Sequence, residues 1–167
     1  VGELLAKELG IPFYDKEIIF LTAKKSGYAE SFIAKYEESK NLFYEQDNDI
    51  FVAETKVIKE ISKTPCVIVG RCADFILAGR ENVINVFVYS DMEDKINRAT
   101  TYYGMDKAKA EKEIKRIDKL RANHYKYYTE KDWNNHSNYD ICINSDVLGV
   151  EKTADLICEL VNEKVRV

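Results

Sequence analysis

The chain has 167 residues, of which 46% are apolar and 32% charged, and its formal net charge is −4. This balance is typical of a globular protein, and the length suffices for one compact domain with a sizeable core. The negative charge disfavours a protein that coats nucleic acid, and no apolar run approaches the roughly 18 residues of a membrane span, so neither partner is expected.

The first part of the chain alternates helical and extended patterns. It opens inside a helical pattern without an initiator Met, so we expect an upstream segment to be missing, and no signal peptide is recognised. A helix is predicted to end at Leu9, with Gly10 in the left-handed conformation that stops helices. Asp15 is placed to cap the next helix. Further helices are predicted over residues 16–25, 29–38 and 50–62.

Apolar runs predict the strands, and capping residues predict the helices between them. Ser90 with Glu93 matches a capping box, and Asp106 is a second helix-capping candidate. Strands are predicted over Ile11–Tyr14, Cys66–Gly70, Val83–Tyr89 and Tyr139–Asn144. Later helices are predicted from Ser90 to about Tyr102, from Asp106 to about Tyr128 and from Val150 to Val165. Strands separated by helices predict an α/β fold with a parallel sheet and helices on both faces.

The cysteines and histidines do not predict a metal site. The spacings of Cys66, Cys72, Cys142 and Cys158 match no zinc pattern, and the two histidines lie far apart in the sequence. Three of these cysteines stand in apolar runs, which favours buried thiols in a reducing cytoplasm. A cytoplasmic location is therefore expected.

Charged residues follow the predicted strands, at the edge where parallel sheets bind ligands. Asp15 follows the first strand, and Gly70, Arg71 and Asp74 follow the second. An arginine fork matches phosphate oxygens, and glycine allows a ligand to approach the backbone closely. The alternative is that Arg71 pairs with Asp74 or another carboxylate. The sequence does not decide between the two.

The helix predicted from Asp106 is densely basic. Asp118 and Arg121 stand one helical turn apart and are placed to pair. One interpretation is a solvated surface helix, which is the usual role of charge runs. The other is a functional helix, because three tyrosines follow closely and a solvated surface does not require them. The basic residues are Lys112, Lys115, Arg116, Lys119, Arg121 and Lys126, and the tyrosines are Tyr125, Tyr127 and Tyr128.

Five segments together resemble the cytidylate-kinase-like family over nearly the whole chain. The N-terminal segment resembles the family's sequence after the phosphate loop, and the most specific segments are the Gly-Arg turn and the lid helix. The segments are VGELLAKELGIPFYD, PCVIVGRCADFIL, NVFVYSDMEDKINRA, KRIDKLRANHYKYYT and YDICINSDVLGVEKTADLI. The residues contain no Walker loop, no Gly-x-Ser-x-Gly and no dinucleotide fingerprint.

The resemblance implies a three-layer P-loop kinase-like fold, with a parallel sheet flanked by helices and a helical lid at approximately residues 104–132. Residues 1–167 are then one domain, whose N-terminal strand and phosphate loop precede Val1. The implied reaction is ATP-dependent phosphoryl transfer to a nucleoside monophosphate, with ATP and Mg²⁺ as cofactors and nucleotides as partners. Relatives carry a longer insertion near residues 41–49, and Cys72 replaces an aspartate of true cytidylate kinases.

The resemblance also implies roles for individual residues. The implied catalytic residues are Arg116, Asp118 and Arg121. The implied substrate-binding residues are Asp15, Arg71 and Asp74, and the implied cofactor-binding residues are Lys119 and Arg98. Three alternatives are a catalytically silent nucleotide-binding protein, a kinase for a different small metabolite, and an interaction module whose tyrosine-rich helix forms a homo-oligomer.

Overall fold

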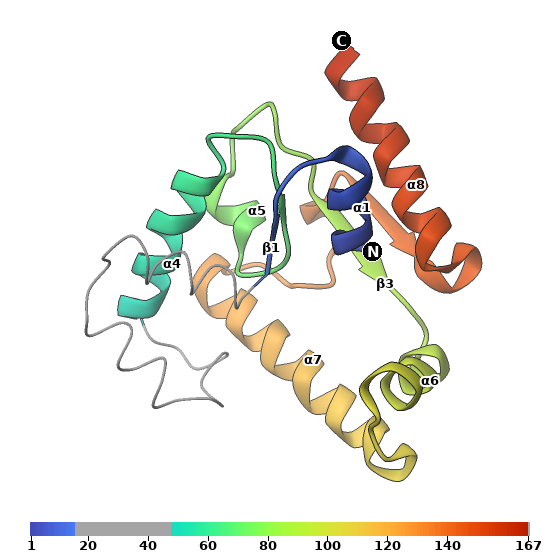
Figure 1. Ribbon diagram of the computed structural model, residues 1–167. Helices are drawn as coiled ribbons and strands as arrows, with labels where there is room; N and C mark the ends of the chain where they lie inside the picture. The colour runs from blue at the N-terminus through green and yellow to red at the C-terminus, as the bar shows by residue number, and fades with distance from the viewer. Residues whose placement is uncertain (16–47, 167) are drawn as a thin grey trace. The chain divides into compact units, whose positions relative to one another are not determined.

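The computed structural model describes residues 1–15 and 48–166 (Figure 1). Its helices are α1 (Gly2–Leu9), α4 (Asn48–Ile61), α5 (Ala73–Ile76), α6 (Met92–Tyr103), α7 (Lys107–Thr129) and α8 (Ser145–Arg166), with a 3-10 turn at His136–Asn138. Its strands are β1 (Phe13–Tyr14), β2 (Val67–Ile68), β3 (Val86–Tyr89) and β4 (Ile141–Asn144). The helices predicted over residues 16–25 and 29–38 lie outside the described residues.

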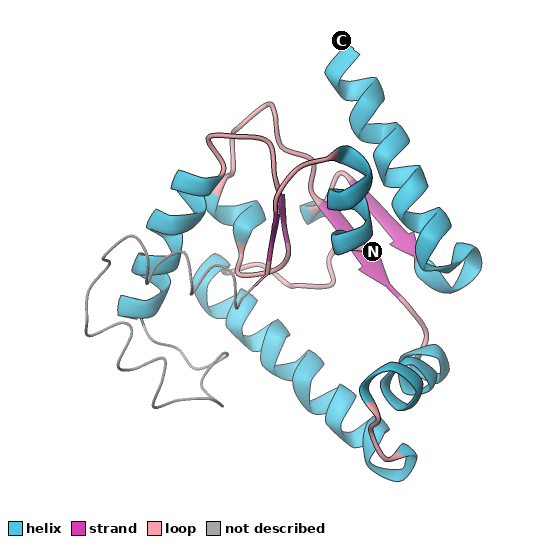
Figure 2. Ribbon diagram, viewed as in Figure 1, coloured by secondary structure: helices cyan, strands magenta, loops and turns pink. Residues whose placement is uncertain are grey.

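The described residues form a helix-rich, mixed α/β protein with small parallel sheets, as Figure 2 shows. The chain divides into two compact units, one of Val1–Val83 with Ala154–Val167 and one of Ile84–Thr153. The α/β class agrees with the sequence, whereas a single domain over residues 1–167 stays a prediction. Within the described ranges, no helix has the length and apolar character needed to cross a membrane.

In the first unit, β1 and β2 pair in parallel, with Phe13 opposite Val67 and Tyr14 opposite Ile68. Helix α1 packs closely on this pair through Gly2. A Cβ at Gly2 would lie 2.9 Å from Cγ2 of Val69, so a larger residue would push the helix away. Gly10 ends α1 with φ of 65°, which confirms the predicted left-handed stop.

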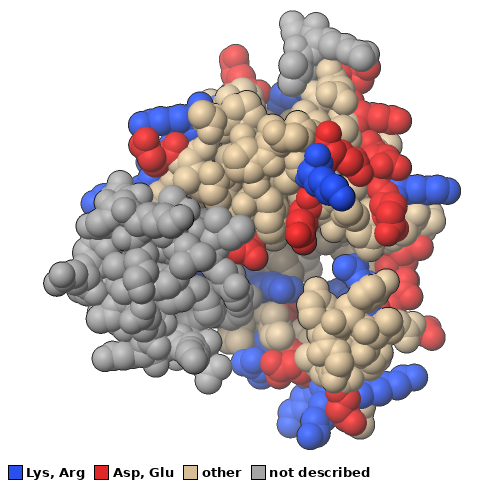
Figure 3. Space-filling view, in the orientation of Figure 1, with Lys and Arg blue, Asp and Glu red and all other residues tan. Residues whose placement is uncertain are grey.

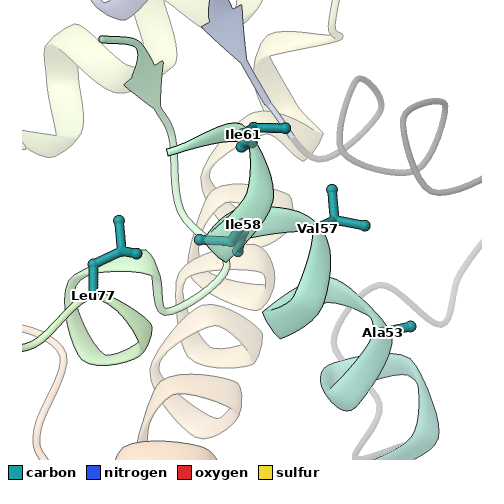
Figure 4. Close-up of a cluster of buried hydrophobic side chains, with 5 residues drawn as sticks. All are labelled: Ala53, Val57, Ile58, Ile61 and Leu77. Atoms are coloured by element: carbon teal, nitrogen blue, oxygen red, sulfur yellow. The ribbon is translucent and has the colours of Figure 1, made fainter. Parts of the chain in front are cut away.

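The core of the first unit lies between α4 and the segment around α5. Residues about one helical turn apart on α4 form a buried cluster with Leu77, and Ile58 points toward Leu77 in the close-up of Figure 4. The buried α4 residues are Ala53, Glu54, Val57, Ile58 and Ile61. One member of this stripe, Glu54, is charged, although a buried helix face is normally apolar.

The second unit is built on the parallel pair of β3 and β4, in register from Val86 opposite Ile141 to Tyr89 opposite Asn144. The Phe87 ring stacks on Tyr139, with ring centroids 4.8 Å apart, and meets the edge of Trp133 at 5.5 Å. The Phe87 side chain of β3 thus belongs to an aromatic cluster. Helices α6 and α7 pack against each other in the same unit.

Among the described residues the strands form two two-stranded parallel sheets, so joining them in the one predicted sheet stays a prediction. The β1–β2 ladder is short because Pro12 has no N–H to donate, and Gly70, with φ of 78°, turns the chain away. Strand directions are parallel as predicted. A correction concerns the cysteines, because Cys142 is exposed and only Cys72 is fully buried.

The predicted Ser90 capping box is also wrong. The N-cap of α6 is Asp91, and its side chain makes no capping hydrogen bond. Its backbone N–H instead donates to Oδ2 of Asp146, at 2.5 Å. Helix α8 begins at Ser145 rather than at the predicted Val150. Gly149 interrupts it with φ of 78° and ψ of 169°, so Val150 begins its second segment.

Candidate functional site

The turn after β2 holds three consecutive residues in the left-handed region. Gly70, Arg71 and Cys72 have φ of 78°, 59° and 56°, and we call these residues the Gly-Arg turn. Glycine adopts this conformation freely, whereas each of the two other residues costs about 1–3 kcal/mol. Such conformations persist only where the surrounding structure imposes them, and they concentrate at functional sites.

Arg71 is buried and forms an ion pair with a carboxylate from α4. Its Nη2 donates to Oε1 of Glu54, and the two side chains are only 7% and 4% exposed. Burial raises the pKa of the Glu54 carboxyl, while the charge and hydrogen bond of Arg71 oppose that rise. A carboxylate, that of Glu54, thus pairs with Arg71, as one of the two sequence interpretations expected.

The other predicted substrate-binding residues lie near the same strand ends. Asp15 directly follows β1, and because β1 and β2 are parallel, Asp15 and the Gly-Arg turn stand at one edge. Asp74 lies in the first turn of α5, directly after the Gly-Arg turn. The structure therefore brings Asp15, Arg71 and Asp74 to one edge of one unit, and their binding roles stay predictions.

Cys72 is buried and only 4% exposed. The pKa of its thiol is raised to about 12, first by burial and also by the charges of Asp74 and Glu54, while the charge of Arg71 opposes the rise. The thiol therefore stays protonated at neutral pH, and it is neither a nucleophile nor an anionic group there.

Sequence reasoning missed Glu54, although the sequence carries a signal for it. Glu54 stands three and four residues before Val57 and Ile58, on the apolar stripe of α4. A carboxylate on the buried face of a helix needs a buried cation as partner. The arginine directly after an apolar strand was the obvious candidate for that cation.

The second unit has an open pocket of about 260 Å³ beyond the carboxyl ends of β3 and β4. Arg98 is the predicted site residue that lines it. Asp94 and Asp146 also line it, and a hydrogen bond between these side chains, with the charge of Asp146, raises the pKa of Asp94. The lining residues are Asp94, Asn97, Arg98, Thr101, Tyr102, Ser145, Asp146, Gly149 and Val150.

Helix α7 carries the other predicted residues. Asp118 accepts a hydrogen bond from Arg121 at 3.1 Å, which confirms their pairing, and one from Lys95 of α6 at 2.7 Å. Nε and Nη2 of Arg116 donate hydrogen bonds of 2.8 and 2.6 Å to the two carboxylate oxygens of Glu113. Arg116, Lys119 and Arg121 are all exposed. Basic and acidic side chains are interspersed over the face in Figure 3. On α7, the ion pairs of Arg116 and Arg121 are exposed, and such surface pairs are weak.

The tyrosines at the end of α7 have different surroundings. Tyr125 is buried in the second unit, whereas Tyr127 is exposed. Tyr128 meets the rings of His124 and Tyr127 edge-on, with centroids 4.8 and 4.9 Å apart. Packing within the chain therefore explains part of the cluster. Among residues 1–15 and 48–166, no group of His, Cys, Asp and Glu side chains is placed to hold a metal ion.

These features define a mixed α/β protein whose charged residues gather beyond the ends of parallel strands. The model of the cytidylate kinase-like family matches residues 1–147, and the chain belongs to that family. A nucleotide-kinase-like role follows at the level of the family.

A solved structure is also similar, a crystal structure of an uncharacterized protein from Eubacterium ventriosum ATCC 27560. The two chains are 28% identical with a TM-score of 0.78, and the match covers 97% of this chain and 89% of that one. No curated protein matches the chain significantly.

Proposed function

We propose that this chain transfers the γ-phosphoryl group of ATP to a nucleoside monophosphate, cytidylate-like, or to a related small acceptor. The family match over residues 1–147 is the observation that carries the proposal. The fold we propose is the three-layer P-loop kinase-like fold, with a helical lid at approximately residues 104–132. The two parallel strand pairs support that fold.

The acceptor is proposed to bind at the Gly-Arg turn. Arg71 binds its phosphate, because a guanidinium presents paired donors to phosphate oxygens. Asp15 and Asp74 orient the rest of the acceptor by accepting hydrogen bonds from its hydroxyl or amino groups. The common edge of Asp15, Arg71 and Asp74 supports this assignment, as does the strained turn that holds Arg71.

The donor nucleotide is proposed to contact Arg98 and Lys119. The pocket of about 260 Å³ lies near the lower limit of about 300 Å³ for small-molecule sites, so it fits a base or ribose rather than a whole nucleotide. Arg98 supplies a cation there and Tyr102 an aromatic ring. ATP supplies the phosphoryl group when bound, together with Mg²⁺ carried on its phosphates.

The transfer itself is proposed to use the cations of α7. A phosphoryl-transfer transition state needs positioning and charge stabilisation rather than covalent help. Arg116 and Arg121 stabilise the transferring charge, and Asp118 orients Arg121 until the phosphate replaces it as the partner of the guanidinium. Both arginines are exposed and held by surface carboxylates, and such pairs are worth only about 0–1 kcal/mol. Each guanidinium can therefore leave its carboxylate for a phosphate at little cost.

Turnover by the full-length protein tests the proposal. ATP should be consumed with CMP, UMP, AMP or GMP as acceptor, and Arg121→Ala should lower kcat at least about tenfold while changing acceptor KM less. Lys109→Ala removes an exposed cation from the same helix and serves as the control. Nucleotide binding without any turnover would instead assign the chain to a silent nucleotide-binding role. Equal kcat for Arg121→Ala and Lys109→Ala would overturn the role of α7.

A further inference from the structure

Glu54 holds Arg71 in a way that fold stability does not explain. A buried ion pair costs desolvation of both charges, and well-packed apolar residues often serve stability as well or better. Here the pair is also incomplete. Among the described residues, no donor reaches Oε2 of Glu54, which is buried. The carboxylate therefore holds the guanidinium through Oε1 and leaves its second oxygen unsatisfied there, which is a further cost.

The backbone at the same place is also strained. Arg71 and Cys72 are the two non-glycine residues of the Gly-Arg turn, and both have left-handed φ values. Two independent costs, in side-chain desolvation and in backbone conformation, thus fall on one arginine. Strain and buried charge coincide where a structure fixes a group for a task.

Helix α4 is suited to hold that group still. Glu54 lies in the middle of the helix, next to Ala53 and one turn before Val57 and Ile58, which are buried in the core. Its carboxylate therefore has little freedom to move. An exposed arginine samples many rotamers, whereas Arg71, clamped to a core residue, presents its guanidinium in one orientation.

We propose that Glu54 is a positioning residue for the acceptor site, and that it orients the Arg71 guanidinium toward the phosphate of a nucleoside monophosphate. This inference deepens the proposed function and rests on it. Glu54 acts through Arg71 and does not touch the substrate. Its loss should therefore weaken the acceptor and leave the donor nucleotide unaffected.

The test compares Glu54→Gln with Glu60→Gln in the full-length protein. Both variants remove one negative charge from α4, but Glu60 is exposed and pairs with Lys63 on the surface. Dissociation constants are measured by calorimetry for CMP, UMP, AMP, GMP and ATP, and unfolding midpoints are measured alongside. Glu54→Gln should weaken the best-bound monophosphate about tenfold and leave ATP within about twofold, because a displaced guanidinium affects the acceptor alone.

A second variant separates positioning from folding. Glu54→Ala should weaken the monophosphate further than Glu54→Gln, whose amide oxygen still accepts from Arg71 and gives partial rescue. Steady-state kinetics should show the same split, with a raised KM for the acceptor and an unchanged KM for ATP. If Glu54→Ala does not fold, the comparison of Glu54→Gln with Glu60→Gln decides the matter.

The outcomes separate this inference from the proposed function. If the wild type binds and phosphorylates a monophosphate, and Glu54→Gln binds it as Glu60→Gln does, the function stands and the positioning role is overturned. A lower unfolding midpoint with unchanged affinity would likewise reduce Glu54 to a structural residue. If the wild type neither binds nor phosphorylates any of the four monophosphates, the proposed function fails and the positioning role fails with it.

Discussion

Two ion pairs in this protein differ in their exposure to solvent, and therefore in how strongly each charge depends on its partner. The Glu54–Arg71 pair of the first unit is almost fully buried, with side chains 4% and 7% exposed. The Arg116–Glu113 pair on α7 is solvated, with side chains 58% and 36% exposed. In a low-dielectric interior each charge depends on its partner, whereas water and salt replace a lost partner at the surface.

This difference in burial separates an arginine that keeps one orientation from arginines that can change their ion-pair partner. A buried guanidinium cannot leave its carboxylate without stranding a charge, so Arg71 keeps one orientation. A solvated guanidinium changes partners at little cost, so the proposed exchange of a carboxylate for a phosphate at Arg116 and Arg121 is inexpensive. A fixed arginine for the acceptor and exchangeable arginines for the transfer are what the proposed reaction requires.

The largest expected effect comes from breaking the buried pair. Glu54→Ala should lower the free energy of unfolding by about 3–5 kcal/mol, because the Arg71 charge is left buried without this carboxylate. Urea unfolding followed by circular dichroism measures it. The double variant Glu54→Leu with Arg71→Met removes both charges and should recover most of the loss. A double variant as unstable as Glu54→Ala would show that burial of charge is not the cause.

The next effect extends the comparison to a buried thiol. The pKa of Cys72 is raised from 9.0 to about 12, so the unfolded chain releases the thiol proton first as the pH rises. Stability from Cys72 is complete below pH 9 and is lost progressively from pH 9 to about 12. Between pH 8 and pH 10.5, wild type should lose about 2 kcal/mol more than Cys72→Ala. Urea unfolding at both pH values measures this loss for each protein. If wild type and Cys72→Ala lose the same unfolding free energy between pH 8 and pH 10.5, the thiol is not buried and protonated.

An intermediate effect is expected for the pair that joins α6 and α7. Lys95 and Asp118 are 32% and 25% exposed, between the two extremes above. Lys95→Ala should therefore cost about 1 kcal/mol of unfolding free energy. Amide hydrogen exchange should quicken around Asp118 and stay unchanged in α4, which belongs to the other unit. If Lys95→Ala lowers the unfolding free energy as much as Glu54→Ala does, the contribution of an ion pair to stability does not increase with its burial.

The smallest effect is expected for the solvated pairs of α7. Glu113→Gln and Glu111→Gln break pairs whose carboxylate side chains are 36% and 52% exposed. Each should change the free energy of unfolding by less than about 0.5 kcal/mol, and 1 M NaCl should reduce even that difference. The same urea titrations measure both. A loss above about 2 kcal/mol in either variant would mean that these pairs are not the exchangeable surface contacts described here.

Local patterns in the sequence determined the helices and their ends. Gly10 stops α1 in the left-handed conformation, as its position after the helical pattern predicted. The spacing of Asp118 and Arg121 predicted their pairing, because residues one turn apart on a helix are neighbours. The parallel direction of the strands also followed, since the connections between paired strands contain helices.

Only the tertiary structure decided which distant residues meet. The sequence placed Arg71 at a strand end but left its partner open, because Glu54 comes from a separate helix and no local periodicity links the two. The same holds for Asp94 and Asp146, which join at the pocket from α6 and α8. The length of a strand could not be predicted from the sequence either. The apolar run Cys66–Gly70 predicted five residues, whereas β2 pairs with β1 only at Val67 and Ile68, and a left-handed turn begins at Gly70. Helix ends and neighbouring-turn pairs depend on nearby residues, whereas buried charge pairs and sheet edges depend on how separate elements pack.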